Sequence, residues 1–114
     1  MSDRLNCLIL IQALIRRVEA AGGFAMVLRK GDPTSGAILL QLLDRTGEPP
    51  HVLERIPDFS GGYRLESIAA KYSGDAEALA QYLDRRTRSD PDLWLIELDV
   101  ADGERLAAET FGGG

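Results

Sequence analysis

The sequence predicts an α+β domain with a mainly antiparallel sheet of about five strands and two helices packed on one face of that sheet. Apolar residues recur at helical spacing in residues 4–21 and 75–88, which predicts the two helices. The other segments are short, apolar and bounded by Gly and Pro, as strands are. The predicted element order is α-β-β-β-β-α-β. Strands joined by short turns are expected to be antiparallel neighbours.

The first helix is predicted over residues 4–21, where one apolar stripe runs along the helix. Ser2 or Asp3 can cap its start, and Gly22 and Gly23 can end it with a positive φ. Its apolar run is shorter than the roughly 20 residues that span a bilayer. Arg16 and Arg17 follow that run directly, unlike the end of a signal peptide. We therefore expect a cytoplasmic protein with no membrane contact.

Short strands separated by turns are predicted between the two helices. The predicted strands are residues 24–30, 37–44, 51–56 and 63–69. The predicted turns are residues 30–36, 46–50 and 57–62. The continuous apolar run at 37–44 suits either a central strand covered on both faces or a short helix. In residues 51–56, alternation places Leu53 and Arg55 on one face and Val52, Glu54 and Ile56 on the other.

The second helix, over residues 75–88, has Ser73 or Asp75 as its cap and arginines in its last turn. A strand over residues 93–100 follows, with apolar residues on both faces. Asp102 and Gly103 form the signal of a two-residue hairpin, which predicts a short return strand. In this interpretation the single domain spans residues 1–114, and residues 104–114 could fray.

Composition excludes several kinds of site. The chain has 114 residues, of which 45% are hydrophobic and 27% charged, as in a soluble globular domain. One Cys and one His allow neither an internal disulfide nor an ordinary zinc site, so we expect no metal and no cofactor. The lone His51 follows Pro49 and Pro50 at a strand start, and no Gly-x-Ser-x-Gly motif accompanies any serine. We therefore expect His51 to be a surface or edge residue and predict no catalytic residue.

Charge is distributed unevenly along the chain. The formal net charge is −5, yet the segment from Asp90 onward has seven acids and one base. An acidic chain is not an expected partner for nucleic acid. Asp99, Asp102 and Glu104 could gather a cation, although a solvated hairpin tip explains them better.

The turn at residues 30–36 suggests a speculative anion site. Its glycines have the spacing of a phosphate-binding P-loop, but Ala37 and Ile38 stand where that motif needs Lys and Ser or Thr. A plain hairpin loop is therefore the favoured interpretation. The residues of the speculative site are Arg29, Lys30, Gly31, Asp32, Gly36, Arg16 and Arg17. A larger anion patch would form only if the two arginine-rich helix ends met, and charge compensation at each helix end is the simpler explanation.

Three segments in this order resemble an alphaproteobacterial family catalogued as domain of unknown function 1491. They are residues 12–17 (QALIRR), residues 30–33 (KGDP) with 35–37 (SGA), and residues 90–94 (DPDLW). The resemblance covers about residues 4–103. It implies a stand-alone cytoplasmic bacterial protein, and it assigns no activity and no catalytic residue. It directs attention to residues 31–33 and 90–94.

Two functional hypotheses follow. The first is a non-enzymatic binding or protein-interaction module, either a homodimer or a domain that docks on an unknown protein partner. Its basis is the apolar first helix, the strand with two apolar faces and the lack of a catalytic set. The alternative is a sensor or enzyme that binds a small anion, such as a phosphate or nucleotide, at the turn from Lys30 to Gly36.

Overall fold

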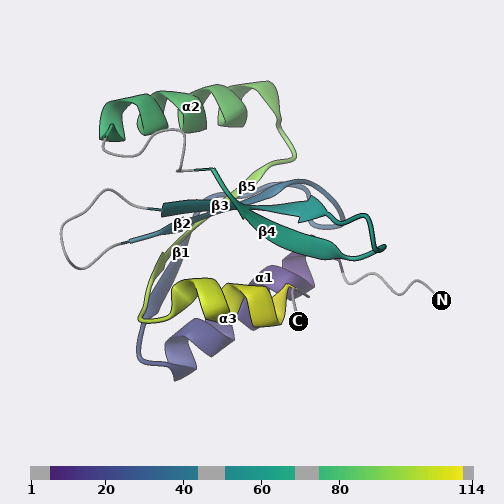
Figure 1. The fold of residues 1–114 in the computed structure, drawn as a ribbon, viewed down its shortest axis with the longest axis vertical. Coiled ribbons are helices and arrows are strands. Elements are labelled where there is room, and N and C mark those ends of the chain that lie inside the picture. The colour runs from purple at the N-terminus through teal and green to yellow at the C-terminus, as the bar shows by residue number, and fades with distance from the viewer. Residues whose placement is uncertain (1–5, 44–50, 69–74, 112–114) are drawn as a thin grey trace.

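The computed structural model describes residues 6–43, 51–68 and 75–111. These residues form an α+β fold with a five-stranded mixed sheet and three helices (Figure 1). In chain order the elements are α1 (Cys7–Ala20), β1 (Phe24–Arg29), β2 (Ile38–Leu42), β3 (His51–Pro57), β4 (Tyr63–Ser67), α2 (Ala76–Ser89), β5 (Trp94–Asp99) and α3 (Gly103–Thr110). No helix among these residues is long and apolar enough to cross a bilayer.

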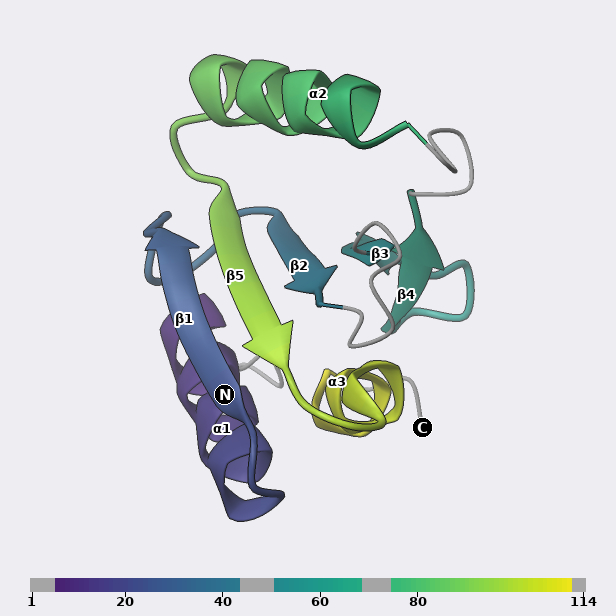
Figure 2. The ribbon, with the colours of Figure 1, turned by 90° about the vertical axis from the view of Figure 1, so that its left-hand side faces the viewer.

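The strand order is β1-β5-β2-β3-β4 (Figure 2). Three of the four pairings are antiparallel, whereas β2 and β5 are parallel. The expectation that β1 and β2 are antiparallel neighbours is therefore wrong, because β5 lies between them. The connection between them passes the start of β5, and the Asp32 N–H donates to the Asp92 carbonyl there at 3.1 Å. It is a crossing segment and not a tight hairpin.

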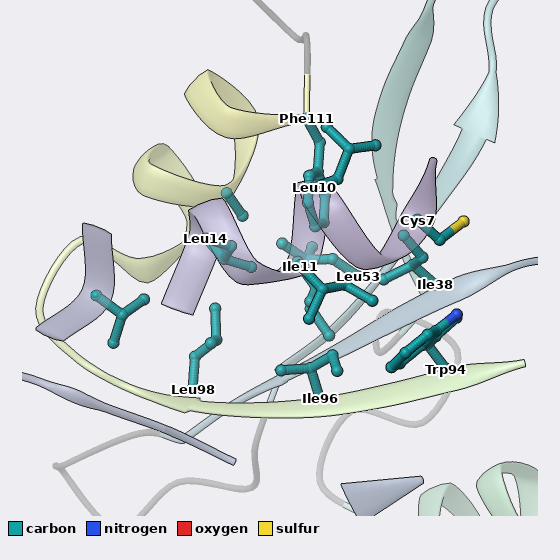
Figure 3. Close-up of a cluster of buried hydrophobic side chains, with 13 residues drawn as sticks. Cys7, Leu10, Ile11, Leu14, Ile38, Leu53, Trp94, Ile96, Leu98 and Phe111 are labelled. Carbon is teal, nitrogen blue, oxygen red and sulfur yellow. The ribbon is translucent and has the colours of Figure 1, made fainter. Parts of the chain in front are cut away.

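Both faces of the sheet are covered. The larger core lies between the sheet and the helices α1 and α3 (Figure 3), and α2 covers part of the opposite face with a smaller core. In β5, Trp94, Ile96 and Leu98 point into the larger core, while Leu95 and the preceding Leu93 point into the smaller one. Residues 38–42 form a strand buried by both layers, which decides between the strand and the short helix.

The prediction of two helices on one face is wrong, because α1 and α2 lie on opposite faces (Figure 1). An amphipathic stripe shows that a helix is covered on one side, but not which face of the sheet covers it. The helix that shares a face with α1 is α3, at the end of the chain.

The predicted hairpin at Asp102 and Gly103 is also wrong. A two-residue type I′ turn needs positive φ at both central residues, and only Asp102 has it, at 58°. The chain instead enters α3 directly. Ala107 of this helix and the following Phe111 are buried in the larger core.

The predicted helix ends are only partly confirmed. The α2 cap is Asp75, whose carboxylate accepts from the Ala78 N–H at 2.9 Å, and Gly22 has the positive φ expected after α1. The cap of α1 is Asn6, because the helix starts later than the sequence suggested. The alternative caps Ser2, Asp3 and Ser73 and the turn at 46–50 lie outside the described residues.

Candidate functional site

Backbone amides of the turn at residues 31–36 donate hydrogen bonds to a carboxylate of the same turn. Asp32 Oδ2 accepts hydrogen bonds from the N–H groups of Thr34 at 3.0 Å and Ser35 at 2.7 Å. These bonds, chiefly the one from Ser35, hold the pKa of the Asp32 carboxyl below its usual value. The two amides that could cradle a phosphate are therefore already occupied by an internal anion.

The same turn is packed against the start of β5. The Trp94 indole N–H donates to the Asp32 carbonyl at 2.7 Å, which pairs the buried nitrogen of the only tryptophan. A Cβ on Gly31 or Gly36 would overlap the Asp92 carbonyl oxygen. Two of the three segments that carry the family resemblance thus meet in space, and Gly31 and Gly36 allow the close backbone approach.

The turn also caps α1. The N–H groups of Cys7 and Leu8 donate to the carbonyls of Thr34 at 3.3 Å and Pro33 at 3.0 Å. Asn6 Oδ1 accepts from the Ile9 N–H at 2.9 Å. The first N–H groups of α1 consequently have partners within the chain and are not donors for a ligand.

The basic residues of the speculative site are not brought together. Arg29 Nη1 donates to the carbonyls of Asp90 at 2.8 Å and Leu93 at 3.2 Å, which holds β1 against the loop before β5. Lys30 is exposed, and the amides of Thr34 and Ser35 that would complete an anion site donate to Asp32.

The basic pair at the other end of α1 is also directed elsewhere. Arg17 binds Glu109 of α3 at 3.0 Å, and Arg16 is exposed. At a rise of roughly 1.5 Å per residue, Arg17 is on the order of 15 Å along the helix from the turn. Of the seven predicted site residues, only Gly36 borders the pocket that the structure contains next to this turn.

That pocket has a volume of about 440 Å³ and lies between the start of α1, residues 34–37 and the strands β3 and β4. This is within the range of small-molecule sites, roughly 300–1,000 Å³. Its charged and polar lining residues are Asn6, Cys7, Thr34, Ser35, Glu54, Arg55 and Tyr63.

Arg55 is the feature that distinguishes this pocket. Its guanidinium carbon lies 3.6 Å from the centroid of the Tyr63 ring and 5.9 Å from that of Phe111. Its Nε is buried and has no hydrogen-bond partner. Within the described ranges, the guanidinium forms no ion pair with a carboxylate. Among the described residues Arg55 is therefore a half-buried cation with no paired carboxylate, which is unusual because desolvated charges are normally paired.

The carboxylate of Glu54, the residue before Arg55, is directed away from Arg55. Glu54 precedes it on β3, so its side chain projects from the opposite face of the sheet. There Glu54 forms a bidentate pair with Arg86 of α2, at 3.1 and 2.8 Å, and Tyr82 also contacts Arg86. The hydrogen bonds to Glu54 raise the pKa of Arg86 above its ordinary value. This pair fastens α2 to β3 and leaves Arg55 as the cation of the pocket.

Cys7 is a poor nucleophile in this setting. Burial raises the pKa of its thiol, although the charge of Arg55 opposes that effect. The Cys7 thiol donates to the Gly36 carbonyl at 3.6 Å, and the residue lies at one end of the larger core (Figure 3). The arrangement suits recognition of a negative group better than covalent chemistry.

Sequence reasoning missed Arg55 and Tyr63 as a site. One signal was available, since Arg55 shares a strand face with the apolar Leu53. The arginines of the two helices form no common patch, because α1 and α2 are on opposite faces. The described residues contain no group of three potential metal ligands, including the acids near Asp102. His51 is exposed at the start of β3, as expected.

Comparison with known proteins identifies relatives over nearly the whole chain. Residues 5–108 match the family described as protein of unknown function (DUF1491). A crystal structure of a DUF1491 protein from Caulobacter crescentus is 33% identical, with a TM-score of 0.77, covering 90% of this chain and 94% of that one.

Two structures determined in solution are similar to the same extent. One is a protein from A. tumefaciens, at 34% identity and a TM-score of 0.71, with 87% and 88% of the two chains covered. The other is a DUF1491 protein from Caulobacter crescentus, at 32% identity and a TM-score of 0.74, with 90% and 91% covered. No curated protein matches the chain.

Proposed function

The chain belongs to the DUF1491 family of proteins of unknown function, and we propose that it is a non-enzymatic binding module for a small anion. The anion would bind in the pocket at Arg55. The observation that carries the proposal is the half-buried guanidinium, whose Nε has no partner.

The stacking geometry supports an anionic ligand. Tyr63 covers one face of the guanidinium, which leaves the N–H groups at its planar edge to donate. Such an edge matches the two oxygens of a carboxylate or phosphate in a bidentate pair. The aromatic ring thus holds the cation in place without neutralising it.

The proposal moves the anion site from the turn to β3. The amides of the turn hold the Asp32 carboxylate, so a second anion there would meet an ionised group. The polar groups of Asn6 and Thr34, at the other wall of the pocket, can supply further hydrogen bonds to a ligand held by Arg55.

A ligand titration tests this function. Inorganic phosphate and succinate would be titrated against the native chain and the Arg55→Gln variant, with thermal unfolding as the readout. An anion at ten times its Kd stabilises the native state by about 1.4 kcal/mol, or roughly 5–10 °C. We expect this shift in the native chain and its loss in Arg55→Gln.

Arg64→Gln is the matched control. Arg64 is an exposed arginine on β4, next to Tyr63, and pairs with Glu66 at 3.3 Å outside the pocket. Its replacement removes the same charge and should keep the thermal shift. Equal shifts in the native chain and Arg55→Gln, or no shift with either anion, would refute a site at Arg55.

A further inference from the structure

The two edges of the sheet differ in their chemistry. The strand β4 carries Arg64 and Glu66, an exposed ion pair at 3.3 Å. Charged side chains of this kind normally prevent an edge strand from pairing with another chain. At the other edge, β1 has no charge from Phe24 to Leu28. The contrast between the two edges makes β1 the candidate for pairing.

β1 also exposes large apolar side chains. Phe24 is 74% exposed and Met26 is 59% exposed, and Val27 and Leu28 are exposed as well. Phe24 and Met26 are two residues apart, so they share a face of the sheet. That face is the one that carries α2, because Ala25 points into the core on the other side. On this face α2 packs against residues of β2, β3 and the start of β5 (Figure 2).

We propose that β1 pairs antiparallel with β1 of a second copy of this chain, around a two-fold axis near Met26. The two sheets would then join into one, and the exposed apolar side chains of each β1 would cover those of the other. A bulge between Val27 and Arg29 limits the regular pairing to the segment before it.

The charges around β1 favour a second copy in this orientation. The exposed Lys30 directly follows the strand, whereas Glu19 is exposed on the last turn of α1 before the strand begins. An antiparallel two-fold places the basic end of one copy near the acidic end of the other. If the two copies stacked face to face through the exposed apolar side chains of β1, Glu97, the cross-strand neighbour of Met26, would lie against Glu97 of the second copy.

The expected dimer is weak. Pairing two short strands buries less surface than the roughly 1,200–2,000 Å² of a stable interface. We therefore expect a dissociation constant in the micromolar range, which sedimentation velocity between about 5 and about 500 µM can measure. The affinity should fall at high salt, because exposed charges contribute to it.

Met26→Lys is the informative variant. In the monomer the lysine would lie beside Glu97 on β5, so the fold should tolerate it. In the dimer two lysines would meet near the axis, and we expect dimerisation to weaken at least about tenfold. Phe59→Lys is the matched control, because Phe59 is fully exposed between β3 and β4, away from this edge.

Three results would overturn the proposal: a native chain that stays monomeric at the highest concentration, a dimer unaffected by Met26→Lys, or a dimer weakened equally by Phe59→Lys. Circular dichroism of each variant confirms that the fold is retained. The proposal is independent of the anion site, since Arg55→Gln should leave dimerisation unchanged.

Discussion

Replacing Gly31 by alanine should strongly destabilise the fold, although the residue belongs to a surface turn. Its φ is not positive, so alanine can adopt the backbone conformation. The added Cβ would nevertheless overlap the Asp92 carbonyl oxygen and lie 2.7 Å from the carbonyl carbon of Leu93. Real Cβ atoms essentially never approach backbone so closely, so the turn must move away from the start of β5.

The cost follows from the hydrogen bonds that this movement breaks. They are the bond from the Asp32 N–H to the Asp92 carbonyl and the bond from the Trp94 indole to the Asp32 carbonyl. Each contributes about 1 kcal/mol, and a buried donor left without a partner costs about 1–3 kcal/mol. We expect Gly31→Ala to lower the free energy of unfolding by about 2–4 kcal/mol, and the Tm by roughly 10–20 °C.

Urea unfolding monitored by fluorescence measures this directly, because Trp94 is the only tryptophan and is buried in the larger core. Gly62→Ala is the control, since no atom lies near its added Cβ and its change should stay within about 0.5 kcal/mol. Gly22→Ala separates backbone strain from overlap, since Gly22 has a φ of +85° but open space around it. Equal stability of Gly31→Ala and Gly62→Ala would refute the reasoning.

Four further predictions concern residues of this turn and of the neighbouring strands and helices. Trp94→Phe should lower the free energy of unfolding by about 1–3 kcal/mol in urea titrations followed by circular dichroism, because the Asp32 carbonyl loses its indole donor. Glu54→Gln should cost about 1–3 kcal/mol, since it leaves half-buried Arg86 without its carboxylate partner, and Glu66→Gln on the exposed edge should cost less. The lowered pKa of Asp32 means that its carboxylate stabilises the fold above the unfolded pKa of about 4, and that this contribution is lost as the pH falls through the lower folded value. The stability difference between the native chain and Asp32→Asn should therefore shrink on acidification, and a constant difference from pH 6 to pH 2 would contradict it. Cys7, whose pKa burial raises, should react with a thiol reagent at pH 8 only as fast as the protein unfolds, and a fast reaction without urea would contradict its burial.

Local sequence patterns predicted most of the elements but not their arrangement. The alternation in residues 93–100 correctly predicted a strand with two apolar faces, and Asp75 was correctly predicted as one of two caps for α2. The insertion of β5 between β1 and β2 depends on hydrogen bonds between residues about sixty positions apart, such as Asp32 and Asp92. A short connection cannot reveal whether another strand will enter beside it.

The candidate site shows the same division. The sequence drew attention to the turn at residues 31–36. Residues 34–36 of this turn do line the pocket, but the amides of Thr34 and Ser35 donate to the Asp32 carboxylate. The pocket's cation, Arg55, was noted only as one member of an alternating strand. Its importance depends on the stacking of Tyr63 and on the docking of α1 with Cys7, which are not local features.

The sequence by itself determined the family, the α+β class and the positions of seven of the eight described elements, because helix periodicity, strand alternation and caps depend on residues a few positions apart. Only the tertiary structure decided the order of the strands, the place of α2 opposite α1, and the helix after Asp102. It alone also placed Arg55 against the Tyr63 ring with its Nε buried. Whether a described carboxylate pairs with this cation depends on how the neighbouring elements are placed around it, and no local pattern contains that information.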